Sequence, residues 1–293
     1  MVATFVIFLR EGIEASMIVA ILLATLDRLG HRRHFRDVII GVAAALVLVA
    51  VGGVAAYLTI KTYGGSRTQT IFETVTYLVA AVVLTYMTFW MRNHAPRLSG
   101  ELRARTAAAL EGRARWGLGL LAFQAVGREG LETMVFTLAI VFASSSRGVL
   151  AGGGSGLAVS LVLAYAIYHL GRRLNVAAFF KVVGALLMVF AAGILVDAVQ
   201  NLQELGWLPV LTHPLWSTAN VLSEDSALGD IFHSFFGYAQ SPTLGQVVVY
   251  LAYLGIAIGA FVGWRHPRRA HPRRVPSRVE GAGRAVTTRP YSS

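Results

Sequence analysis

Residues 38–60 read VIIGVAAALVLVAVGGVAAYLTI, an apolar run without a charged side chain. As a helix, this run would extend about 35 Å, enough to cross about 30 Å of membrane hydrocarbon. Similar runs recur along the whole chain, approximately at residues 2–27, 38–60, 71–91, 117–143, 148–170, 176–198 and 243–264. The pattern predicts an all-α integral membrane protein with seven transmembrane helices.

The composition agrees with this class and excludes several kinds of site. The chain is 55% apolar, only 14% charged, and contains no cysteine. A disulfide framework, a thiolate metal site and a CxxC redox site are therefore excluded. No Walker lysine motif is present, so a nucleotide site is not expected. The first run carries Arg10, Glu11 and Glu14 and lacks a signal-peptide cleavage pattern, which predicts a retained first helix.

The positive charges predict how the chain crosses the membrane. The formal charge is +11, and the Lys and Arg residues gather in alternate connections: 21 lie on one side, 3 on the other, and Arg10 and Arg128 within runs. The positive-inside rule then places the N-terminus outside and the C-terminus in the cytoplasm. We expect residues 1–264 to form one transmembrane domain and residues 265–293 a basic, disordered cytoplasmic tail. No motif in the tail supports nucleic-acid binding.

An internal repeat connects the two halves of the chain. Arg10-Glu-Gly-Ile-Glu14 returns as Arg128-Glu-Gly-Leu-Glu132, each within an apolar run. The first three helices (repeat A, about 1–92) would then pair with the next three (repeat B, about 117–198). Because three is an odd number, the second set enters the membrane from the opposite side, which predicts an inverted repeat. An outer loop, about 199–242, and a seventh helix, about 243–264, follow the repeats.

The two motifs predict an ion-binding site. From the rise per residue, Glu11 and Glu14 are expected about 14–18 Å below the outer end of their helix, and Glu129 and Glu132 about 18–22 Å above the inner end of theirs. Each pair shares one helical face. Four glutamates and two arginines leave a formal deficit of two negative charges, which a hard multivalent cation would fill. The alternative is that each motif only neutralises itself and fixes helix packing. The repeated Gly12 and Gly130 are expected to let the first and fourth helices approach closely.

At these residues the sequence resembles the oxidase-dependent iron permease family, which includes the fungal high-affinity iron permease and bacterial counterparts. The resemblance covers the chain to about residue 264. It is carried by the two motifs and by Leu9, Ala15, Phe72-Glu73, Phe89-Trp-Met-Arg92, Arg173-Leu-Asn175, Phe179-Phe-Lys181, Phe236-Gly-Tyr238 and Pro242.

The resemblance implies iron transport across a bacterial plasma membrane. It implies that Glu11, Glu14, Glu129 and Glu132 bind the transported ion, with Arg10 and Arg128 as motif partners. It further implies that an extracytoplasmic partner, of haem-peroxidase or metal-binding-lipoprotein type, oxidises and delivers the iron, which then crosses as the ferric ion. Iron would be the substrate, and no organic cofactor is expected.

Other acidic residues have a weaker claim to function. The outer loop lacks Lys and Arg but carries acids and histidines that could gather cations, although outer loops generally lack basic residues. Glu73 and Asp197, near the ends of the third and sixth helices, could relay cations inward or could be helix-end anchors. The predicted relay comprises Glu73, Asp197, Glu224, Asp225 and Asp230. Residues 97–116 are expected to form an amphipathic helix on the inner leaflet.

Three alternatives stay open at this point. The same carboxylates could carry another cation, such as manganese or lead. Paired Glu-x-x-Glu helices also resemble those of di-iron carboxylate oxidases, although these use Glu-x-x-His on two of their helices. A structural or regulatory subunit would tolerate replacement of Glu14 or Glu132 by Gln, whereas a transporter is expected to lose transport when any of the four glutamates is replaced.

Overall fold

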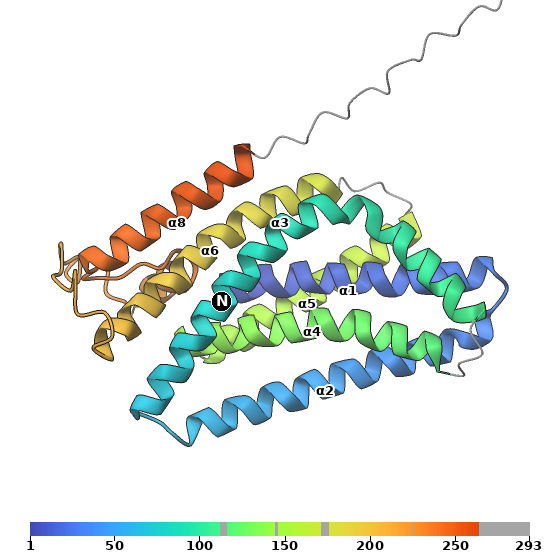
Figure 1. Ribbon diagram of the computed structural model, residues 1–293, viewed down its shortest axis with the longest axis horizontal. Helices are drawn as coiled ribbons and strands as arrows, with labels where there is room; N and C mark the ends of the chain where they lie inside the picture. The colour runs from blue at the N-terminus through green and yellow to red at the C-terminus, as the bar shows by residue number, and fades with distance from the viewer. Residues whose placement is uncertain (112–115, 144–145, 171–175, 225, 264–293) are drawn as a thin grey trace, which may run out of the picture.

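The computed structural model describes residues 1–111, 116–143, 146–170, 176–224 and 226–263. Within these residues the chain is all-helical, with eight α-helices and one short 3-10 helix, drawn in Figure 1. The elements in chain order are α1 (Val2–Arg28), η1 (Arg32–His34), α2 (Phe35–Lys61), α3 (Arg67–Glu111), α4 (Gly117–Ala143), α5 (Ser146–Leu170), α6 (Val176–Glu204), α7 (Ala227–Phe236) and α8 (Leu244–Gly263). The basic tail and Asp225, about which the sequence makes predictions, lie outside the described residues.

Five helical segments are long and apolar enough to cross a membrane within the described ranges. They are Arg32–Lys61, Arg67–Met91, Gly148–Tyr165, Lys181–Glu204 and Leu244–Phe261. Helices α1 and α4 each have 27 residues, about 40 Å, but each carries the three charged residues of its motif. The chain is therefore a multi-pass helical protein by this measure, and seven crossings stay a prediction.

Small residues set the closest helix contacts. Helix α1 packs chiefly on α5, α4 on α2, and α3 on α6, while α8 lies against α6. Gly156 of α5 is so close to α1 that a Cβ there would meet the carbonyl oxygen of Phe5, and a Cβ on Gly41 of α2 would meet the carbonyl of Gly119 in α4. Glycines at such contacts let helix backbones approach closely, as is common between membrane helices.

Two apolar clusters lie on either side of the charged motifs. The first contains Ile7 of α1 and Phe136 of α4, and the second contains Ile18 of α1 and Val126 of α4. In both helices the motif falls between the residues that enter one cluster and those that enter the other. The charged side chains are thus held by helices that are packed firmly above and below them.

Helix α3 is longer than the sequence predicts. It continues past the expected end at residue 91 to Glu111 and bends in Figure 1. The helix includes Pro96, which lacks the N–H that a regular turn requires. The expected amphipathic helix is present as the second half of α3, but Leu102 is buried against α1, α2 and α4. Leu102 therefore covers protein. The placement of this segment on the inner leaflet stays a prediction.

Candidate metal site

The first motif lies in the middle of α1 and is almost completely buried. Arg10 is 2% exposed, and Glu11 and Glu14 are each 3% exposed. Arg10 Nη1 lies 2.8 Å from Glu11 Oε1, and Arg10 Nε lies 3.0 Å from Glu14 Oε1. One guanidinium therefore contacts both carboxylates of its own motif: Glu14 at the i, i+4 spacing that brings side chains together on a helix, and Glu11 as its neighbour in the chain.

Glu129 of α4 faces this pair across the helix interface. Glu11, Glu14 and Glu129 are all buried, and each offers a carboxylate oxygen within 4.8 Å of the other two. Within the described residues this is the one group of three or more potential metal-ligating side chains at such spacing. Two helices far apart in the sequence thus bring their acids to one point, as the two motifs predict.

Glu132 is the exception among the four predicted ligands. It is not part of the close group, and its side chain is 13% exposed. Arg128 Nε lies 3.0 Å from its Oε1, so the carboxylate is directed to its own motif partner. The structure therefore places three of the four predicted ligands together and the fourth beside them.

The arginine of the second motif has surroundings that the sequence does not reveal. The Arg128 side chain is 44% exposed, and its guanidinium carbon lies 4.6 Å from the centre of the Trp90 ring of α3. Its Nη2 also contacts the sulfur of Met87 at 3.2 Å. A cation over an indole face is attracted by the ring's charge distribution. Trp90 belongs to the stretch that carries the family resemblance, but no spacing rule assigned it a role.

Several carboxylate oxygens at the site have unused hydrogen-bonding capacity. Oε2 of Glu11, of Glu129 and of Glu132 are buried and accept no hydrogen bond from the described residues. A buried oxygen without a donor or cation is costly, so such oxygens suit a ligand that brings positive charge. Hard cations are bound by carboxylate oxygens of this kind. The residues present fit a cation between α1 and α4, and they disfavour the view that each motif merely neutralises itself.

A cavity reaches the site from the side of α2 and α5. It has a volume of about 550 Å³, and Glu11 and Glu129 lie in its lining among mostly apolar residues such as Phe8, Leu46 and Leu157. A second cavity, of about 760 Å³, shares Leu46 and Leu157 with it and extends along α1 to Asp27. The carboxylates therefore have space beside them.

The two motif glycines do make close helix contacts, but with other helices than predicted. A Cβ on Gly12 would collide with Ser160 of α5, and a Cβ on Gly130 would lie 2.9 Å from Cγ2 of Val49 in α2. The prediction that these glycines bring α1 and α4 together was wrong, because the acidic face, not the glycine face, of each helix is turned toward the other. Gly12 and Gly130 instead bring an outer helix against each motif.

The predicted relay residues lie apart from the three glutamates. Asp197 of α6 lies 3.7 Å from His233 of α7. Glu73 of α3 accepts a hydrogen bond from Gln69 at 2.6 Å, and Glu224 accepts one from the backbone of Gln240. Asp230 lies in the first turn of α7, a helix that the sequence does not predict. Asp197, Glu73 and Glu224 are thus each engaged with a neighbouring group.

Together these features describe a multi-pass helical membrane protein with a buried cluster of carboxylates between two helices. Comparison with known proteins gives the family. The sequence profile described as "Iron permease FTR1 family" matches residues 1–265. The chain belongs to the iron permease FTR1 family.

Curated relatives match over nearly the whole length. The chain is 33% identical over 264 residues to "Ferrous iron permease EfeU" of Escherichia coli O6:K15:H31 (strain 536 / UPEC), covering 89% of this chain and 95% of that one. It is 33% identical over 272 residues to the protein of the same name from Shigella sonnei, with 92% and 97% covered. For Yersinia pestis the identity is 34% over 256 residues, with 87% and 90% covered. No solved structure matches the chain significantly.

Membership in this family confirms the resemblance that the motifs suggested. The chain is an iron permease family transporter and not an enzyme. The di-metal oxidase alternative is therefore set aside, as is a purely structural subunit.

Proposed function

We propose that this protein imports iron through the carboxylates of Glu11, Glu14, Glu129 and Glu132. The observation that carries the proposal is the convergence of three buried glutamates from two helices, with oxygens within 4.8 Å of one another. Glu132, beside this group, has a free oxygen and completes the ligand set when Arg128 releases it. Arg10 offsets part of the negative charge while the site is empty.

We place this site in a seven-crossing, inverted-repeat transporter. If α1, α2 and α3 correspond to α4, α5 and α6, the contact of α1 with α5 has its counterpart in that of α4 with α2. The contact of Gly12 with α5 and that of Gly130 with α2 form a second matching pair. Such correspondence supports a two-fold relation about an axis in the membrane plane, with the ion bound near that axis and released inward as the halves rearrange.

The ferric ion is the proposed form, delivered after oxidation by an extracytoplasmic iron-oxidising or iron-delivering partner. Carboxylates that are only partly offset by arginines suit a hard multivalent ion, and the family resemblance implies the ferric form. The curated relatives are named ferrous iron permeases, so the oxidation state is the point to test. The acids that the sequence predicts for the outer side (Glu73, Asp197, Glu224, Asp225 and Asp230) would draw the ion toward the membrane.

The decisive experiment is uptake of radioactive iron into proteoliposomes that contain the purified protein. Ferric and ferrous iron are offered separately to wild type and to Glu14→Gln. We expect uptake by wild type and none above empty liposomes by Glu14→Gln, because the neutral side chain removes charge from the cluster. Glu101→Gln is the matched control, since Glu101 lies exposed on the second half of α3, away from the site.

Manganese and lead in the same assay test the other cargo. Preference for either over both iron forms would overturn the iron assignment, and uptake by Glu14→Gln equal to wild type would overturn the carboxylate site. Uptake of ferrous but not ferric iron would leave the site standing and remove the need for an oxidising partner.

A further inference from the structure

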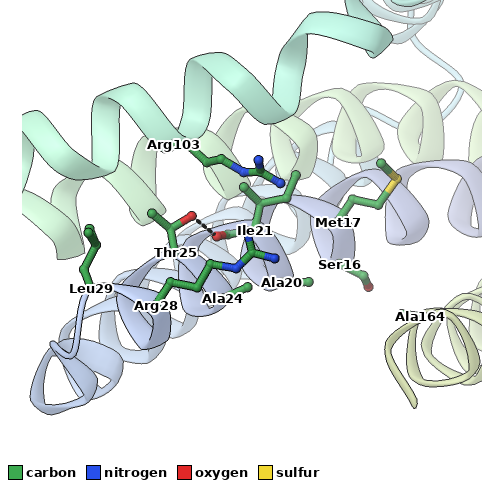
Figure 2. Close-up of a pocket in the computed structure, with 10 residues that line it drawn as sticks. All are labelled: Ser16, Met17, Ala20, Ile21, Ala24, Thr25, Arg28, Leu29, Arg103 and Ala164. Carbon is green, nitrogen blue, oxygen red and sulfur yellow. Dashed lines mark hydrogen bonds between the residues drawn. The ribbon is translucent and has the colours of Figure 1, made fainter. Parts of the chain in front are cut away.

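A further cavity lies along the C-terminal half of α1, on the side that faces the second half of α3; it shares Ser16, Ala20, Ala24 and Arg28 with the 760 Å³ cavity. Its volume is about 340 Å³. Figure 2 shows its walls: Met17, Ala20, Ile21 and Ala24 follow one face of α1, and Ala164 of α5 lies at the far end. These walls are apolar, and the small alanines leave a furrow beside the helix.

Two arginines from different helices meet at one end of this cavity. Arg28 ends α1, and Arg103 belongs to the second half of α3. In Figure 2 both guanidinium groups are turned toward the space between the two helices. Among the described residues, neither forms an ion pair, whereas nearby Arg32 is paired with Asp27. Two positive charges therefore stand together over an apolar furrow without a partner for either.

Nothing in the described wall competes for a ligand at this end. Thr25 donates its hydroxyl to the carbonyl of Ile21 at 2.6 Å, the dashed line in Figure 2, and so is already engaged. A ligand that matches the site must carry negative charge at one end and an apolar chain at the other. Guanidinium groups bind phosphate oxygens well, since their N–H donors form a planar fork.

The length of the furrow fits one membrane leaflet. From Ser16 to Arg28 the helix rises about 18 Å, which is close to half of the hydrocarbon thickness plus the start of the headgroup region. In the proposed orientation these arginines lie on the cytoplasmic side, where anionic lipids gather basic residues.

We propose that this cavity binds one anionic phospholipid of the inner leaflet, with the phosphate between Arg28 and Arg103 and an acyl chain along Met17, Ala20 and Ala24. The inference rests on the proposed orientation but not on the iron assignment. A bound chain would fill the furrow beside α1 and tie α3 to it through the shared headgroup.

The test is native mass spectrometry of the purified protein with phosphatidylglycerol or phosphatidylcholine of the same chain length. We expect wild type to retain one phosphatidylglycerol and to bind phosphatidylcholine much more weakly. Arg28→Gln/Arg103→Gln should weaken phosphatidylglycerol binding about 30-fold, because each basic residue contributes to attraction of an anionic lipid. The control Arg36→Gln/Arg105→Gln removes the same charge from exposed positions outside the cavity and should bind like wild type.

A second variant tests the acyl chain without changing charge. Ala24→Phe fills the furrow and should also lose the bound phosphatidylglycerol, while its melting temperature without lipid shows that it is folded. Equal loss in the two arginine pairs, or equal binding of both lipids, would overturn the site. Displacement of the lipid by millimolar inorganic phosphate would overturn the lipid assignment in favour of a simple anion site.

Discussion

The two motifs share four of five residues, yet their arginines lie in different surroundings. Arg10 is 2% exposed and contacts both glutamates of its motif, whereas the Arg128 side chain is 44% exposed, contacts Glu132 and stacks on Trp90. In the first motif the guanidinium is a fixed counter-charge inside the protein. In the second it has an alternative partner and access to space, so it can leave its carboxylate at lower cost.

This difference suggests that the two motifs contribute differently to ion binding. Glu11 and Glu14 are already held in place by Arg10, so α1 supplies a preorganised half of the site. The α4 half has one glutamate, Glu129, in the cluster and one, Glu132, withheld by Arg128. Binding of the ion would then require movement mainly on the α4 side. The predictions below test this asymmetry.

The largest expected effect comes from removing the two arginines separately. Arg10→Ala leaves two buried glutamates without their counter-charge and should destabilise the folded protein by about 3–5 kcal/mol. Arg128→Ala loses a partly exposed pair and a ring contact and should cost about 1 kcal/mol. Unfolding of the purified variants in detergent measures both values, with Arg105→Ala on the exposed side of α3 as control. Equal losses for Arg10 and Arg128 would remove the asymmetry.

The second comparison is between Glu129 and Glu132. From the sequence alone, replacement of either is expected to abolish transport equally. The structure predicts unequal effects on binding. Glu129→Gln should weaken metal affinity more than about 100-fold, whereas Glu132→Gln should weaken it about tenfold, because Glu132 joins the ligand set only after its contact with Arg128 is broken. Equilibrium binding of ferric iron to the purified protein measures this. A greater loss of metal affinity in Glu132→Gln than in Glu129→Gln would mean that Glu132, not Glu129, is the more important ligand from α4.

The third comparison concerns the motif glycines. Gly130→Ala forces a methyl group against Val49 and should cost about 1–3 kcal/mol of stability. The double variant Gly130→Ala/Val49→Ala should recover most of this loss, because the second change removes the obstructing methyl groups. Gly154→Ala in α5 is the control, since a Cβ there meets no atom within 4 Å, and it should be neutral or stabilising. Failure of the double variant to recover would mean that Val49 is not the obstacle; unfolding in detergent reports all three.

The hydrophobic runs and the motif spacing predicted most of the helices and the glutamates at the centre of the candidate site. The fourth run, predicted at 117–143, coincides with α4 (Gly117–Ala143), and the first, predicted at 2–27, differs by one residue from α1 (Val2–Arg28). The i, i+3 spacing placed Glu11 and Glu14 on one face correctly. Long apolar stretches leave the chain little choice between helix and other structure in a membrane.

Features that depend on which helices become neighbours could not be predicted from hydrophobic runs and motif spacing. Spacing puts Glu129 and Glu132 on one face but does not say how far that face is turned from α1, so the separation of Glu132 was not predictable. The partners of Gly12 and Gly130 depend on packing angles for the same reason. Helix α7 was missed although Ser226 caps its start and Gly237, with φ of +67°, ends it, because a short helix in a polar loop gives little periodicity.

The smallest expected effect is the coupling between Arg128 and Trp90. A double-mutant cycle of Arg128→Gln, Trp90→Leu and both together should give a coupling energy of about 0.5–1 kcal/mol, the size of a cation–aromatic contact that is partly open to solvent. The corresponding cycle of Arg10→Gln with Trp90→Leu should give none, because among the described residues Arg10 pairs with Glu11 and Glu14, and it is Arg128 that lies over the Trp90 ring. If Trp90 holds Arg128 during transport, Trp90→Leu should also change the rate of iron uptake while leaving equilibrium binding of the ion nearly unchanged. A Trp90→Leu variant that loses ion binding and uptake in parallel would instead mean that the indole helps to position Glu129. The movement proposed for the Arg128 side chain would then be a movement of α4 as a whole.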